Sequence, residues 1–264
     1  AGAVGRALLG SMPEAVGHWG FDLHMTLMIV LTSATLGLIW ACRRGLDRRS
    51  LLSMGLEWDA RARLDGGIGL ALGAGLVAGS VLLTAVLGYG RWRLASPGEV
   101  GWLLHSGRLL LALVGLLAAA LFEEVVYRGY IAGGLAESGR PYIGVLVSSL
   151  LFAFGHANNP GAWESPLPLI NMFLSGATLA LLYLRLRCLW GPWLAHFAWN
   201  YSLLLSGGAV SGLSGPRLLE QVVTGPGTVT GSEYGVEGGL MTTAFHAAAI
   251  VALFCWKGRA ERPN

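Results

Sequence analysis

Charged residues are scarce in this chain of 264 residues: they make up 12% of it, against 54% hydrophobic residues. A soluble domain typically contains about 25% charged residues. A chain with so few charges cannot cover its surface with polar groups in water, which excludes an ordinary soluble globular protein. Insertion into a lipid bilayer removes this problem, because lipid tails solvate apolar side chains.

Lysine and paired cysteines are nearly absent as well. Lys257 is the single lysine, and the arginines are spread between apolar runs instead of forming one patch with interleaved aromatic residues. This distribution does not fit a nucleic-acid surface, so we expect no nucleic-acid partner. Cys42, Cys188 and Cys255 lie far apart without a C-x-x-C pair, which argues against a disulfide framework and predicts small apolar residues in or beside helices.

Seven apolar segments are long enough, or nearly so, to cross about 30 Å of hydrocarbon as helices. They contain small residues, such as Gly75-x-x-x-Gly79, that let helices pack closely. The segments are approximately 25–42, 67–90, 101–133, 142–157, 167–184, 188–206 and 238–256. We therefore predict an all-α fold, a polytopic transmembrane helix bundle of about seven spans. Residues 25–256 would form one transmembrane domain, between an N-terminal segment (1–24) and a C-terminal tail (257–264).

The basic residues between these segments indicate the topology, because Arg and Lys concentrate in cytoplasmic loops. Twelve of the 18 basic residues fall on one side of the predicted membrane and four on the other, with Arg108 and Arg128 inside spans. This excess predicts a cytoplasmic C-terminus. Residues 207–237 contain no apolar run and are expected to form a long extracytoplasmic loop, and the protein is expected to be integral to a bacterial plasma membrane. The predicted cytoplasmic set is Arg43, Arg44, Arg48, Arg49, Arg61, Arg63, Arg140, Arg185, Arg187, Lys257, Arg259 and Arg262.

Ionisable side chains inside apolar helices are costly and point to function. Glu123, Glu124 and Arg128 lie near the end of the third apolar segment. Glu124 and Arg128 are four residues apart, so they share a helix face and can pair, whereas Glu123 points about 100° away. The charge of Glu124 would then be neutralised by Arg128, whereas Glu123 would stay unpaired and could act as a general base. The alternative is that both carboxylates serve only structure.

Two histidines lie in later apolar segments: His156 in the fourth, and His196 one turn before Asn200 in the sixth. At about 1.5 Å per residue, Glu123 and His156 lie about 22 and 27 Å from the turn near 137–141, so an antiparallel hairpin brings them to similar depth. His196 and Asn200 share a helix face, where two donors could hold an oxyanion. Either histidine could instead serve only hydrogen bonding between helices.

Three motifs follow one another in the pattern EExxxR, FxxxH and HxxxN, each on a separate apolar segment. They read Glu123-Glu124…Arg128, Phe152…His156 and His196…Asn200. In this order they resemble the CPBP family, the CAAX prenyl endopeptidases with their bacteriocin-processing and Abi-type relatives, which are glutamic intramembrane proteases. The resemblance covers about residues 100–206.

The resemblance implies a role for each matching residue. Glu123 and His156 would activate a water, and His196 and Asn200 would stabilise the oxyanion. The supporting residues would be Glu124 and Arg128, with Phe152 as a packing residue.

The implied activity is that of an intramembrane endopeptidase, a hydrolase that cleaves a membrane-associated protein or peptide in the lipid bilayer without a cofactor or metal. Two alternatives remain. In a zinc-dependent metalloprotease, Glu123, His156 and His196 would be the ligands, although no HExxH motif is present. In a membrane scaffold or immunity-type protein, the same residues would have no catalytic role.

Overall fold

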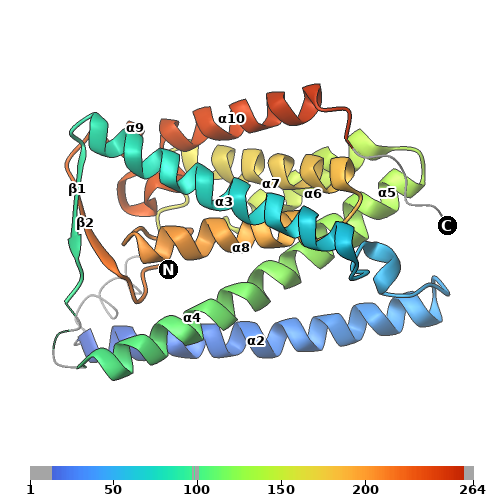
Figure 1. The fold of residues 1–264 in the computed structure, drawn as a ribbon, viewed down its shortest axis with the longest axis horizontal. Helices are drawn as coiled ribbons and strands as arrows, with labels where there is room; N and C mark the ends of the chain where they lie inside the picture. The colour runs from blue at the N-terminus through green and yellow to red at the C-terminus, as the bar shows by residue number, and fades with distance from the viewer. Residues whose placement is uncertain (1–13, 97, 99–100, 259–264) are drawn as a thin grey trace.

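The computed structural model describes residues 14–96, 98 and 101–258, with side chains from residue 20 onward. Its long helices pack together as a bundle (Figure 1), which confirms the predicted all-α fold. The main helices are α2 (Glu14–Gly45), α3 (Ala60–Val86), α4 (Gly101–Glu124), α5 (Gly133–Glu137), α6 (Pro141–Gly155), α7 (Leu167–Leu186), α8 (Trp190–Leu205) and α10 (Leu240–Cys255).

Four helical segments in the described part of the chain are long and apolar enough to cross a membrane. They are Gly20–Gly45, Ala60–Val86, Gly101–Glu137 and Leu167–Leu186. The apolar helices α6 and α10 contain 15 and 16 residues, fewer than the roughly 20 that a straight span requires. The number of seven spans therefore stays a prediction.

The helix that carries the acidic pair continues without a break from Gly101 to Glu137. It does so because α4 passes through η3 (Val125–Ala132), a π-helical segment, into α5. In Figure 1 this helix begins beside α2 and crosses toward the other helices. A π-helical segment inside an α-helix is rare and often occurs at a functional site. Here it begins directly after Glu124 and contains Arg128.

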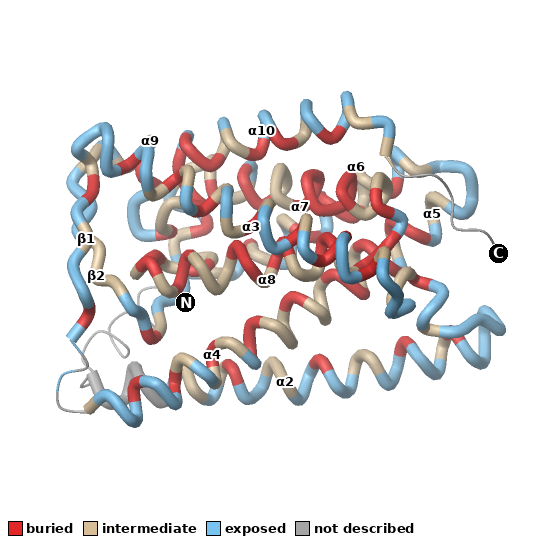
Figure 2. The backbone as a smooth tube through the Cα atoms, viewed as in Figure 1, coloured by how far each residue is buried: buried red, intermediate tan, exposed pale blue. Residues whose placement is uncertain are grey.

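Burial is concentrated in the middle of the bundle. Figure 2 shows buried residues clustered in α7 and α8, whereas α2 and the outer face of α10 are largely exposed. The exposed side chains of α2 include Leu23, Val30 and Leu38, which suit contact with lipid tails. The core thus lies around the helices that carry the candidate site residues.

Glycines bring α3 into direct backbone contact with α8. A Cβ atom added at Gly69 would lie 2.0 Å from the carbonyl oxygen of Gly191, and one at Gly73 would lie 2.1 Å from that of Ala195. The motif noted in the sequence, Gly75-x-x-x-Gly79, does not make this contact, because a Cβ at Gly75 would have nothing within 4 Å. Gly69 and Gly73 thus allow the two backbones to touch, and Gly66 on the same helix also faces α8, where an added Cβ would lie 2.8 Å from Leu194 Cδ1.

We expect Gly73→Ala to destabilise the protein by about 1–3 kcal/mol, because its methyl group would overpack the seam between α3 and α8. The displaced residue, Ala195, precedes His196, so activity should fall together with thermal stability. Gly75→Ala is the matched control, since the same methyl group would enter open space on the same helix. Equal melting temperatures for the two variants in detergent would contradict this description of the seam.

The predicted loop at 207–237 is folded, with regular structure of its own. Strand β2 (Leu219–Val223) pairs antiparallel with β1 (Gly90–Leu94), with Gly90 opposite Val223 and Leu94 opposite Leu219. Three short helical turns follow: α9 (Gly227–Thr230), η4 (Ser232–Tyr234) and η5 (Val236–Gly238). These turns contact α7 and α10, so the loop forms one end of the bundle.

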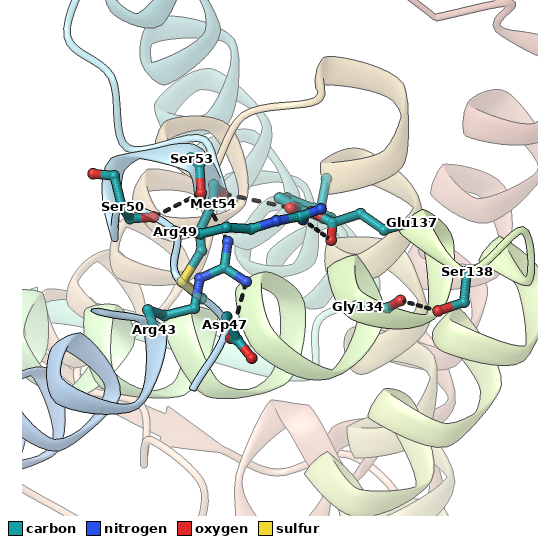
Figure 3. A network of polar contacts seen from close by, with 10 residues as sticks. Arg43, Asp47, Arg49, Ser50, Ser53, Met54, Gly134, Glu137 and Ser138 are labelled. Atoms are coloured by element: carbon teal, nitrogen blue, oxygen red, sulfur yellow. Dashed lines mark hydrogen bonds and ion pairs between the residues drawn. The ribbon is translucent and has the colours of Figure 1, made fainter. Parts of the chain in front are cut away.

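Polar contacts tie the segment after α2 to the end of the long helix (Figure 3). Arg43 donates to Asp47 and, at 2.8 Å, to Ser53 in the short helix η1 (Leu52–Met54). Arg49 pairs with Glu137, the last residue of α5. The helix that carries Glu123 is therefore anchored at the end opposite the loop 207–237.

Candidate active site

Four residues from three helices meet at one cavity. Glu123 comes from the end of α4, His156 from the C-terminal end of α6, and His196 and Asn200 from successive turns of α8. All four line the same cavity, which α2 and the loop residues Val210, Ser211 and Leu213 also border. The similar depth expected for Glu123 and His156 is consistent with this arrangement.

Behind the cavity, Glu124 lies between two basic side chains. Arg128 Nη1 donates to Glu124 Oε1 at 2.7 Å, and His196 Nδ1 donates to the same oxygen at 2.9 Å. The side chains of Glu124 and Arg128 are 0% exposed. A carboxylate withdrawn from water in this way depends on its partners for stabilisation. The predicted pairing of Glu124 with Arg128 is present, and the contact with His196 was not predicted.

Phe152 connects the ion pair to both histidines. The Arg128 guanidinium lies 4.5 Å from the centre of the Phe152 ring, a cation–π distance. The imidazoles of His156 and His196 lie 4.6 and 5.7 Å from the same ring. Phe152 is 1% exposed, so it packs the base of the site.

Glu123 differs from Glu124 in its surroundings. Its side chain is partly exposed and borders the cavity. No described residue makes a hydrogen bond to its buried oxygen Oε2. A buried carboxylate oxygen without a protein donor lacks a hydrogen-bond partner that a water molecule or a substrate would supply.

Both histidines are oriented by their Nδ1 atoms. His156 Nδ1 lies 2.8 Å from the carbonyl oxygen of Phe152, which can only accept, so this nitrogen carries a proton. His196 Nδ1 donates to the Glu124 carboxylate in the same way. With Nδ1 fixed, the Nε2 atom is the nitrogen left for chemistry. A neutral His156 can accept a proton there.

Sequence reasoning missed Glu237, which lies at the end of the loop 207–237. It is 3% exposed and lines a second, more apolar cavity that shares His156, His196 and Asn200 with the first. Burial raises the pKa of Glu237, against the opposing effect of hydrogen bonds from Ser211 and Trp199. The loop has no helical or strand period to place this residue in the core. It also contains two other acidic residues, Glu220 and Glu233, and nothing in the sequence distinguishes Glu237 from them.

The described residues do not include a cluster of side chains that could bind a metal ion. Among them, no group of three or more His, Cys, Asp and Glu side chains is arranged to hold a metal ion. Glu123, His156 and His196 border one cavity, but as placed they do not fit the ligand set of the zinc alternative.

The middle of the chain is similar to known proteins. Residues 105–202 match the family described as type II CAAX prenyl endopeptidase Rce1-like. A Bacillus subtilis (strain 168) protein named "Putative membrane peptidase YdiL" is 30% identical over 91 residues, which is 34% of each chain. The match thus spans about a third of that relative's length. No solved structure matches the chain significantly. The resemblance to the CPBP family is confirmed, and the apolar helices are those of an integral membrane protein.

Proposed function

We propose that this chain, whose residues 105–202 belong to the CAAX prenyl endopeptidase-like family, is an intramembrane endopeptidase of the glutamic type. It hydrolyses a peptide bond in a membrane-associated protein or peptide. The observation that carries the proposal is the shared cavity of Glu123, His156, His196 and Asn200, with a buried ion pair behind it. Peptide hydrolysis needs a base for water and donors for the oxyanion, and this set supplies both.

In the proposed reaction, Glu123 and His156 bind a water molecule at the cavity wall. Glu123 takes a proton as the water oxygen attacks the carbonyl carbon of the substrate. The proton then passes to the leaving amine as the peptide bond breaks, which returns Glu123 to its ionised state. The unpaired Oε2 of Glu123 and the acceptor nitrogen of His156 suit these steps.

The oxyanion is proposed to bind between His196 and Asn200. Because His196 Nδ1 already donates to Glu124, Nε2 can donate to an oxyanion only when the ring is an imidazolium. The carboxylate of Glu124 stabilises that cation. Asn200 would supply the second donor from its side-chain amide, one helical turn away.

We expect His196→Ala and Asn200→Ala each to lower turnover by about 10²–10³-fold, the usual effect of removing one oxyanion donor. Only His196→Ala should also lower the melting temperature, because it removes a partner of buried Glu124. Asn158→Ala, at an exposed position beyond α6, is the control for Asn200→Ala. Normal turnover in Asn200→Ala would argue against an oxyanion site at this position.

The direct test of the activity is a comparison of protein termini in membranes that contain the wild type or Glu123→Gln. New termini should appear only with the wild type. Adding a chelator and then restoring metal ions tests the zinc alternative, since loss and recovery of cleavage would favour it. If neither protein generates new termini, the chain is better explained as a non-catalytic membrane protein.

The proposed location is a bacterial plasma membrane with the C-terminus in the cytoplasm. The support is the distribution of arginines, several of which lie at the end of the bundle that contains Arg49 and Glu137. Reporter fusions at the C-terminus and within 207–237 should report opposite sides of the membrane. Reports from the same side would reject this topology.

A further inference from the structure

The buried carboxylate of Glu237 connects the loop 207–237 to the helix that carries two candidate catalytic residues. Its Oε1 atom accepts a hydrogen bond from Trp199 Nε1 on α8 at 2.7 Å. Its Oε2 atom accepts one from the backbone N–H of Ser211 in the loop. The two side-chain oxygens therefore hold two N–H donors that come from different segments of the chain.

The backbone of Glu237 is fixed separately. Asn171 on α7 donates from Nδ2 to the carbonyl oxygens of Glu237 and Gly239, at 2.7 and 2.9 Å. Thr243 on α10 donates to Asn171 Oδ1 at 2.7 Å. The Glu237 side chain therefore extends from an anchored backbone toward α8 and the loop.

Both partners of Glu237 lie next to the candidate catalytic groups. Trp199 precedes Asn200 and follows His196 by three residues. Ser211 lines the cavity that contains Glu123 and His156. Ser211 also has a φ of 48°, a left-handed conformation that a serine keeps only when its surroundings hold it. The Glu237 carboxylate is the acceptor for the N–H of this residue.

We propose that Glu237 is a positioning residue for the peptidase reaction. Through Trp199 it fixes the turn of α8 that presents His196 and Asn200, and through Ser211 it holds the loop as a wall of the catalytic cavity. This inference rests on the proposed function. A simpler role, in which Glu237 only stabilises the loop, predicts lower stability but normal turnover for each folded molecule.

The variants that separate these roles are Glu237→Gln and Trp199→Phe. The glutamine side chain keeps the size of Glu237 but directs an NH₂ group at one of the two donors. Trp199→Phe removes one donor and keeps an aromatic ring. Glu233→Gln is the matched control, because Glu233 is an exposed acidic residue in the same loop.

Purified proteins are added to membrane vesicles from cells that express Glu123→Gln, in which the substrate stays uncut. The rate at which new termini form is measured against vesicle concentration. We expect Glu237→Gln to lower the maximal rate per folded molecule by about 10–10²-fold, the effect of displacing catalytic groups, with little change in apparent KM. Trp199→Phe should also lower the maximal rate. The maximal rate of the double variant should be no lower than that of Glu237→Gln, because both changes break one hydrogen-bond network.

Hydrogen exchange gives a second measurement that does not depend on cleavage. The Ser211 amide should exchange at least about 10-fold faster in Glu237→Gln, with no such change in Glu233→Gln. A wild-type maximal rate per folded molecule in Glu237→Gln, or unchanged Ser211 exchange, would overturn the positioning role alone. Cleavage by purified Glu123→Gln would instead refute the proposed function, whatever the result for Glu237.

Discussion

The Glu123→Gln variant is expected to lose about 10²–10⁴-fold in cleavage rate, the contribution of a well-placed general base, while it folds like the wild type. The amide is nearly isosteric with the carboxylate but cannot take a proton from water. Glu123 borders the cavity, and no described residue makes a hydrogen bond to its Oε2. The substitution therefore removes no hydrogen bond from the protein to that oxygen. The loss should therefore appear in turnover and not in stability.

The measurement is the rate of formation of new termini, together with the melting temperature in detergent. Glu233→Gln is the matched control: it makes the same change at an exposed position outside the helix that carries Glu123. A Glu123→Gln variant that cleaves at the control's rate would reject Glu123 as the base. One that fails to fold would show that this carboxylate supports structure.

The bundle and the grouping of the motif residues were predictable because both depend on local chain geometry. Apolar runs locate helices in a membrane protein, since backbone groups in lipid must be satisfied internally. The spacing of Glu124 to Arg128, and of His196 to Asn200, is one helical turn, which sets a shared face. The structure shows the Glu124–Arg128 pair directly. The catalytic roles of the four cavity residues stay predictions.

Contacts that depend on tertiary packing could not be predicted in this way. The π-helical segment after Glu124 has no signature in the apolar pattern. Gly69 and Gly73, not the equally suggestive Gly75, face a neighbouring helix, because periodicity does not say which face meets which partner. Glu237 lies 38 residues from its donor Trp199, in a loop without periodicity. Long-range pairings of this kind follow from the folded chain alone.

Arg128→Ala is expected to lower the free energy of unfolding by about 3–5 kcal/mol, the usual cost of removing one partner from a buried ion pair. Arg128 is 0% exposed, pairs with Glu124 and also donates from Nη2 to the carbonyl oxygen of Gly176 at 3.2 Å. Its loss would also leave a cavity against Phe152. Folded yield should fall along with activity, unlike the result expected for Glu123→Gln.

Thermal unfolding in detergent measures this effect, with Arg140→Ala as the control because it removes the same side chain from an exposed position. Adding Glu124→Ala to Arg128→Ala should cost less than the sum of the two single changes, since the double variant buries no unpaired carboxylate. Glu124 also accepts from His196, so activity should not return with stability in the double variant. If Arg128→Ala melts at the temperature of the control, the buried pair does not support the site.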